Sequence, residues 1–88
     1  MYNENNIFYK EKYKMFEEIK GIIAKQLRIN KDEIQNSQRL IEDLGADSLE
    51  LAEILMTIEE KLGIFISDED VEKIKTVQDI SDQLEKLK

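Results

Sequence analysis

Apolar side chains recur every three or four residues in the first third of the chain, the spacing of one face of an α-helix. The repeat comprises Tyr9, Tyr13, Phe16, Ile19, Ile23 and Leu27. It predicts a first helix that begins near Asn5 or Asn6 and ends near Gln26, with a frayed tail over residues 1–6. We therefore expect an N-terminal extension over residues 1–14, partly helical or disordered, followed by a helical domain over residues 15–88.

A second helical repeat follows after a long interval and predicts a helix from Ser48 to Leu62, with Gly63 at its C-terminal stop. Its main apolar stripe consists of Leu51, Ile54, Leu55, Ile58 and Leu62. A lighter apolar line, formed by Leu49, Ala52 and Met56, runs beside acidic positions. The pattern favours the edge of the core for this second line, although a helix with the core on one side and a weak apolar seam on the other also suits transient binding.

Two shorter helices are predicted in the last quarter of the chain. Ser67 can cap a short third helix that ends around Ile74. Thr76 and Asp79 have the spacing of a capping box, which opens a fourth helix. The apolar positions of that helix are Val77, Ile80, Leu84 and Leu87. The predicted fold is therefore all-α, a small four-helix bundle with three longer helices, one short third helix and a long loop after the first helix.

The long loop, residues 27–46, has no helical period. The segment from Asn30 to Ile34 is typical of a single capped turn, and Asn36-Ser37 is a further turn signal. Loops of this length are uncommon unless they are anchored. We expect four spaced apolar side chains to pin this one over the bundle: Ile34, Leu40, Ile41 and Leu44.

A turn at the end of this loop leads into the second helix and contains the residues that point most directly to a function. Gly45 can reverse the chain direction, and Asp47 can cap the helix with Glu50 as its capping-box partner. Ser48 then stands at the first helical position, where unpaired backbone N–H groups and the helix dipole favour an attached anion. The pattern favours a phosphate attached at Ser48.

Composition excludes several classes of enzyme. The chain has no cysteine and no histidine, which removes disulfides, the usual zinc ligands and any Ser-His or Cys-His arrangement. Ser48 has no activating base, so we expect a non-catalytic protein. The calcium-loop pattern started at Asp43 has Ser48 in place of glycine and Ile54 in place of glutamate, and no specific metal site is expected.

The net charge of −7 is concentrated in the middle of the chain. Residues 1–31 carry seven basic and four acidic side chains (+3), residues 32–72 carry two and thirteen (−11), and residues 73–88 carry four and three (+1). Such an acidic block is unsuited to nucleic acid and suited to basic protein surfaces, although it also serves as a solvated coat. No apolar run approaches the roughly 20 residues that span a bilayer, so we expect no membrane insertion.

The sequence LGADSLE, within IEDLGADSLELAEILMTIEEKLG and followed by ISDEDVEKIKTVQDI, resembles the acyl carrier proteins of type II (dissociated) fatty acid synthesis. The resemblance covers roughly residues 16–87. It implies a covalent 4′-phosphopantetheine, transferred from coenzyme A to Ser48 between Asp47 and Leu49 by a holo-synthase (phosphopantetheinyl transferase). The thiol of this group would carry acyl chains as thioesters in fatty acid biosynthesis.

The resemblance also implies two groups of binding residues on a monomer. Basic surfaces of synthase enzymes and acyltransferases would dock on Asp47, Glu50, Ala52, Glu53, Met56, Glu59 and Glu60. The acyl chain would enter a cavity between the second and third helices, lined by Leu55, Ile58, Leu62, Ile64, Val71 and Ile74. The chain departs from the family pattern at Ser67, where proline is typical, and at Phe65, which is unusually apolar.

Two alternatives stay open at this point. The first is a carrier of another cargo, such as a polyketide, an aminoacyl group or D-alanine; the acidic second helix and Asp47 argue against the aminoacyl type. The second is an acidic helical interaction module without a prosthetic group. The N-terminus lacks the features of a secretory signal or a transit peptide. We therefore expect a bacterial cytoplasmic protein, or a matrix or stromal one if a eukaryotic precursor has been processed.

Overall fold

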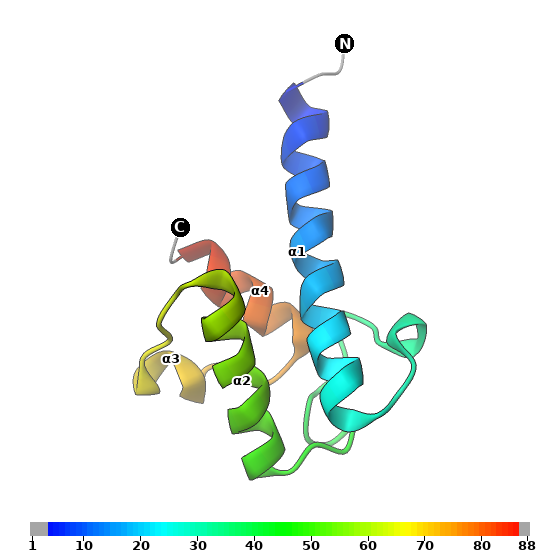
Figure 1. Cartoon of the computed structure of the whole chain (residues 1–88), viewed down its shortest axis with the longest axis vertical. Coiled ribbons are helices and arrows are strands. Elements are labelled where there is room, and N and C mark those ends of the chain that lie inside the picture. Colours follow the sequence, from blue (N-terminus) through cyan, green and yellow to red (C-terminus); the bar gives the residue numbers. More distant parts are fainter. Residues whose placement is uncertain (1–3, 87–88) are drawn as a thin grey trace.

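A computed structural model describes residues 4–86. The regular secondary structure of this part of the chain is entirely helical. The order is α1 (Glu4–Leu27), the 3₁₀-helix η1 (Lys31–Glu33), α2 (Ser48–Leu62), α3 (Asp68–Glu72) and α4 (Val77–Lys86). Figure 1 shows α1 as the longest helix, with its N-terminal turns projecting past the other helices. The predicted all-α bundle with a short third helix is confirmed.

The core lies where one face of each longer helix meets the loop. The close backbone contacts between elements join α1 to α2, to α4 and to η1. The buried apolar cluster comprises Met15, Ile19, Ile23, Ile34, Leu40, Ile54, Leu55, Ile58, Ile66, Ile74, Val77, Ile80 and Leu84. The predicted stripe of α2 is confirmed, with its three central residues buried and Leu51 and Leu62 packed against the cluster.

Helix α1 differs from its sequence prediction in two respects. It begins at Glu4, so residues 4–6 are helical and not frayed. The placement of Tyr13 on the buried face is wrong, because its side chain is 67% exposed. Tyr13 precedes Ile19 by six residues, which places it about 120° away around the helix, whereas Met15 lies nearer the buried side. The side chain of Tyr9 lies outside what the structure describes.

Arg28 ends α1 in a backbone conformation that favours glycine. Its φ is 60°, in the left-handed region, and Ile29 N–H donates to the carbonyl of Ala24 at 3.0 Å, as in a Schellman stop. A side chain in this conformation costs about 1 kcal/mol relative to glycine.

Arg28→Gly is therefore expected to raise the free energy of unfolding by roughly 0.5–1 kcal/mol, measured by chemical denaturation. Arg28→Ala keeps the left-handed strain and serves as the control, because it changes only the side-chain charge and length. An equal gain from both substitutions would assign the effect to the lost charge and not to the backbone.

The long loop is ordered by turns and by hydrogen bonds to the start of α4. Asn30 caps η1, with its Oδ1 accepting from Asp32 N–H at 2.9 Å, so the predicted capped turn is confirmed. Leu40 N–H donates to the carbonyl of Lys75 at 2.9 Å, and Val77 N–H donates to the carbonyl of Gln38 at 3.1 Å. This short antiparallel bridge joins the long loop to the segment that enters α4.

Three of the four predicted loop anchors pack inward. Ile34 and Leu40 are buried, and Leu44 packs against the core from its edge. The prediction for Ile41 is wrong, because that side chain is 46% exposed. Leu40 occupies the inward position at the bridge, and the chain turns immediately afterward, so the next side chain leaves the core.

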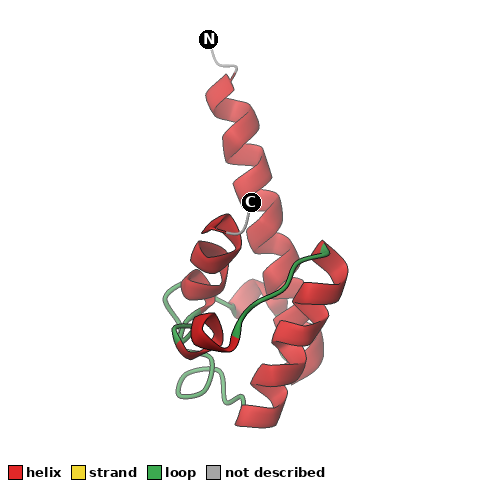
Figure 2. Ribbon diagram, turned by 90° about the vertical axis from the view of Figure 1, so that its left-hand side faces the viewer, coloured by secondary structure: helices red, strands yellow, loops and turns green. Residues whose placement is uncertain are grey.

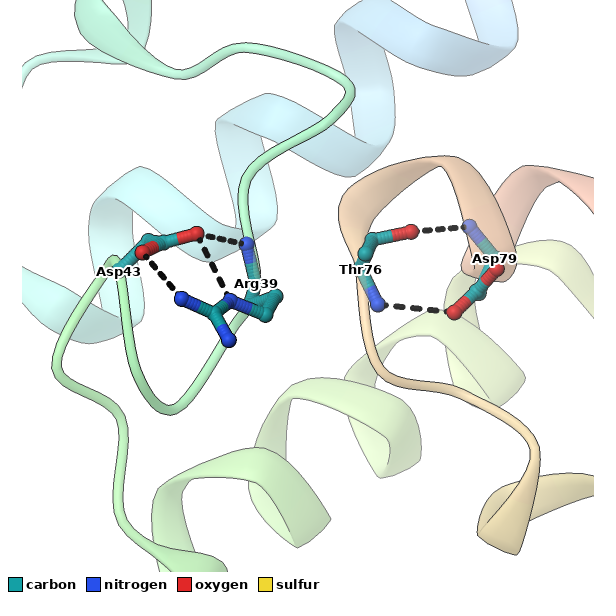
Figure 3. A network of polar contacts seen from close by, with 4 residues as sticks. All are labelled: Arg39, Asp43, Thr76 and Asp79. Carbon is teal, nitrogen blue, oxygen red and sulfur yellow. Dashed lines mark hydrogen bonds and ion pairs between the residues drawn. The ribbon is translucent and has the colours of Figure 1, made fainter.

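The capping box of α4 forms as predicted and is drawn in Figure 3. Asp79 N–H donates to Thr76 Oγ1 at 3.1 Å, and Asp79 Oδ2 accepts from Thr76 N–H at 3.0 Å and from Lys75 N–H at 2.8 Å. Val77, Ile80 and Leu84 are buried as expected. Leu87 lies outside the described residues.

Helix α3 is shorter than predicted, because it ends at Glu72 and not near Ile74. Ser67 caps it as expected, with its Oγ accepting from Asp70 N–H at 3.2 Å. The bonds that follow, from Lys73 N–H to Asp70 and from Ile74 N–H to Val71, span three residues, so the helix tightens into a turn. Ile74 nevertheless remains buried.

Candidate functional site

The turn that enters α2 is held by its backbone. Gly45 has a φ of 82°, a conformation that side chains rarely adopt. Its N–H donates to the carbonyl of Ile41 at 3.1 Å, and Ala46 N–H donates to the carbonyl of Leu40 at 3.0 Å. Ala46 is 2% exposed, so the turn is fixed in the core just before the helix begins.

Asp47 and Glu50 cap the first turn of α2 reciprocally. Glu50 N–H donates to Asp47 Oδ1 at 2.7 Å, and Asp47 N–H donates to Glu50 Oε1 at 3.1 Å. The capping box predicted from the sequence is therefore confirmed. Both carboxylates lie at the positive end of the helix dipole, where negative charge is stabilising.

Ser48 occupies the first position of α2 and is exposed, and the neighbouring Leu49 side chain is 68% exposed. The hydroxyl therefore stands on a rigid helix start, open to solvent and to a modifying enzyme. An attached phosphate would lie near first-turn N–H groups that have no partner within the helix. The residues present fit a phosphate ester of this hydroxyl.

Upstream of this turn, Asp43 closes a loop with Arg39, as Figure 3 shows. Its Oδ2 accepts from Arg39 N–H at 2.8 Å and from Arg39 Nε at 3.3 Å, and its Oδ1 accepts from Arg39 Nη2 at 3.4 Å. The backbone N–H and then the guanidinium lower the pKa of the Asp43 carboxyl below its ordinary value of 3.8.

Because this pKa is lowered in the folded state, the Asp43 carboxylate stabilises the fold above the unfolded-state pKa, and this contribution is lost as the pH falls through the folded-state pKa. Asp43→Asn should lower the free energy of unfolding at pH 7. The difference in this free energy between the variant and the wild type should shrink steadily as the pH falls from about 5 to about 3. Denaturation series at each pH measure it, with Glu42→Gln as the neighbouring control. A difference that stays constant with pH would contradict the role of the charge.

The acidic face of α2 is open to solvent. Of the side chains predicted to bind partners, Asp47, Ala52, Glu53, Met56 and Glu60 are exposed, and Glu50 and Glu59 are half-buried. Leu49 and Met56 are 68% and 57% exposed, so the second apolar line of α2 is not the edge of the core. The interpretation as an apolar seam on an acidic surface fits this exposure.

A hollow of about 330 Å³ lies on this face, lined by Gln26, Glu53, Met56, Thr57 and Glu60. Gln26 Nε2 donates to Glu53 Oε1 at 2.7 Å and joins the end of α1 to α2. Sequence reasoning missed Gln26, since nothing in the sequence places it beside a residue 27 positions later. It also missed Thr57, whose spacing from Glu53 and Glu60 on one helix face was the available signal.

The residues predicted to line an acyl cavity all lie in the apolar core or at its edge. Leu55, Ile58 and Ile74 belong to the buried cluster, while Leu62, Ile64 and Val71 are partly buried against it. All six therefore belong to the same apolar core or pack against it, and they come from α2, α3 and the segments on either side of α3.

Two further findings bear on the kind of site. Among the side chains that the structure describes, in residues 13–86, acidic groups do not gather in threes closely enough to hold a metal ion. Within residues 4–86 no helix has the length and apolar character needed to cross a membrane.

Comparisons with known proteins point to one family. The sequence profile described as "Phosphopantetheine attachment site" matches residues 17–84. The chain is 46% identical over 66 residues to an acyl carrier protein of Wolinella succinogenes, covering 75% of this chain and 87% of the relative. It is 48% identical over 65 residues to an acyl carrier protein of Helicobacter hepaticus, covering 74% and 86%.

Solved structures agree with the sequence matches. A candidate acyl carrier protein from Mycobacterium tuberculosis superposes with a TM-score of 0.76 at 37% identity, covering 81% of this chain and 95% of that one. The acyl carrier protein of Enterococcus faecalis superposes with a TM-score of 0.74 at 30% identity, covering 88% and 98%. Both likenesses extend over nearly the whole of the solved chains.

Proposed function

The chain belongs to the acyl carrier protein family, which bears phosphopantetheine, and we propose that this group is attached through the hydroxyl of Ser48. The observation that carries the proposal is the placement of an exposed serine at the first position of α2, on a turn fixed by Gly45 and Ala46. The matched family profile spans this position.

The chain itself supplies no thiol on which a thioester could form. It has neither cysteine nor histidine, so a thioester has to form on a thiol that the cofactor brings. When bound, phosphopantetheine supplies that thiol on a flexible arm. We propose that the protein is non-catalytic and that a phosphopantetheinyl transferase modifies Ser48 with coenzyme A as the donor. Ser48 Oγ forms a phosphoester with 4′-phosphopantetheine and loses its proton, the pyrophosphate bond of coenzyme A breaks, and 3′,5′-adenosine bisphosphate leaves.

The cargo in this proposal is the growing chain of fatty acid synthesis. The apolar region of Leu55, Ile58 and Ile74, with the partly buried side chains around it, is a suitable shelter for an alkyl chain. These residues offer apolar surface on the side of α2 opposite the exposed acidic face. We propose that the acyl chain is taken up between α2 and α3.

Loading with coenzyme A tests the proposal directly. The purified protein is incubated with coenzyme A, magnesium and a promiscuous phosphopantetheinyl transferase, and its intact mass is measured. We expect a gain of one phosphopantetheinyl group per chain, followed by acylation of the new thiol by a fatty acyl synthetase. An unchanged mass under conditions that modify another acyl carrier protein would overturn the proposal.

We propose that partner enzymes dock on the hollowed acidic face of α2 through basic surfaces. Glu53→Lys or Glu60→Lys should weaken binding to the transferase by roughly tenfold, because each change replaces an attraction with a repulsion. Added salt should weaken the wild-type complex in the same direction. Surface plasmon resonance measures both effects, with Glu18→Lys on α1 as the control. An equal effect of all three reversals would indicate net charge and not a defined docking face.

A further inference from the structure

Glu59, in the last turn of α2, binds the loop that follows through three backbone N–H groups. Its carbonyl accepts from Gly63 N–H, which caps the helix with a φ of 66°, and from Ile64 N–H at 3.1 Å. Its side-chain Oε2 reaches further and accepts from Ile66 N–H at 2.7 Å. One residue therefore fixes both the start and the far part of the loop, residues 63–67.

The loop held in this way places alternate side chains on opposite sides. Ile64 is half-buried and Ile66 is 4% exposed, whereas Phe65 between them is 76% exposed. In Figure 2 the loop is the green segment that runs from the end of α2 to the short helix α3. Ile64 is one of the residues to which we assign the acyl chain, and Ile66 belongs to the buried cluster against which it packs.

Among the described residues, α3 has no extensive backbone contact with another helix. The close backbone contacts of the bundle join α1 to α2, α4 and η1, and α3 is not among these pairs. Helix α3 has only five residues, Asp68–Glu72, too few to be stable without tertiary support. The bond from Ile66 N–H to the Glu59 carboxylate is part-buried and charge-assisted, which makes it stronger than an ordinary surface hydrogen bond.

We infer that Glu59 is a positioning residue whose carboxylate keeps the loop 63–67 closed over the acyl-binding region. The inference rests on the proposed uptake of the chain between α2 and α3. Glu59 is half-buried, and only its Oε2 accepts from Ile66 N–H, so the carboxylate bonds the loop while remaining partly open to solvent.

The first experiment measures the loop without any cofactor. Amide hydrogen exchange at Ile66 is compared in the wild-type apo protein, Glu59→Ala and Glu60→Ala. Glu60 is the matched control, because it is exposed, adjacent and equally charged in the same helix turn. We expect Ile66 to exchange about tenfold faster in Glu59→Ala, and at the wild-type rate in Glu60→Ala.

Glu59→Gln separates the hydrogen bond from the charge, since its amide oxygen can still accept from Ile66 N–H. Its exchange rate should lie between those of the wild type and Glu59→Ala. Equal Ile66 exchange in Glu59→Ala and Glu60→Ala would overturn the inference, whatever the state of the cofactor. The hydrogen-exchange measurement does not depend on modification of Ser48.

The second experiment tests the consequence for the cargo. Each variant is loaded with an octanoyl-phosphopantetheine group, and cleavage of the thioester by hydroxylamine is followed by mass. We expect cleavage to be several-fold faster in Glu59→Ala than in the wild type and Glu60→Ala. Equal cleavage combined with faster Ile66 exchange would overturn the role of Glu59 in sheltering the chain. Failure of every variant to load would count against the attachment proposal alone.

Discussion

Ser48→Ala is expected to abolish the gain of the phosphopantetheinyl group while leaving the fold intact. The hydroxyl is the proposed point of attachment, and alanine offers no oxygen for the transfer. The cap of α2 does not depend on this side chain, because Asp47 and Glu50 form the capping box. The position is exposed, and alanine is well tolerated at a helix start, so the free energy of unfolding should change by less than about 0.5 kcal/mol.

Intact mass after treatment with coenzyme A and transferase measures the first part, and thermal melting measures the second. Ser37→Ala is the matched control, because Ser37 is also an exposed serine but lies in a turn of the long loop. It should gain the full group, as the wild type does. A Ser48→Ala protein that still gains the full mass would place the attachment elsewhere, and loss of the gain in Ser37→Ala would mean that Ser48 alone does not account for the modification.

The attachment turn could be predicted from the sequence because its geometry is local. Gly45 with a positive φ, Asp47 as a cap and Glu50 as its partner all lie within six residues, and residue type alone favours each role. The same holds for the Thr76 and Asp79 box at α4. The spacing of apolar residues also predicts α2, since its apolar stripe from Leu51 to Leu62 repeats over about three turns.

Contacts between distant residues could not be predicted in the same way. The sequence predicts a partner-docking role for the Glu59 carboxylate, whereas its bond from Ile66 N–H depends on the path of the loop that follows α2. Gln26 reaches Glu53 only because α1 and α2 cross there. Tyr13 matches the helical repeat of three and four residues. The buried face of α1, however, depends on which of its side chains pack against α4 and the loop.

The loop shows the same limit within two adjacent residues. Leu40 and Ile41 are both large and apolar, and composition does not distinguish them. The bridge from Leu40 N–H to the Lys75 carbonyl, with the turn after it, directs the first side chain into the core and the second outward. One is fully buried and the other is 46% exposed. This contrast makes the pair a direct test of how the loop is anchored.

Leu40→Ala is expected to lower the free energy of unfolding by about 2–5 kcal/mol, because it removes a fully buried side chain and leaves a cavity beside the loop. This is a large part of the 5–15 kcal/mol that stabilises a typical domain. Ile41→Ala removes a similar apolar volume from a largely hydrated site and should cost less than about 1 kcal/mol. Urea denaturation of the two variants measures the difference.

The Leu40 variant should also disturb the attachment turn, because the Leu40 carbonyl accepts from Ala46 N–H two residues before Ser48. Amide exchange at Ala46 should therefore increase in Leu40→Ala and stay near the wild-type rate in Ile41→Ala. Equal losses of stability in the two variants would mean that the loop packs on both side chains. A stability loss in Leu40→Ala without faster exchange at Ala46 would mean that the turn is held by its own residues, and that the long loop supports the bundle without positioning the serine.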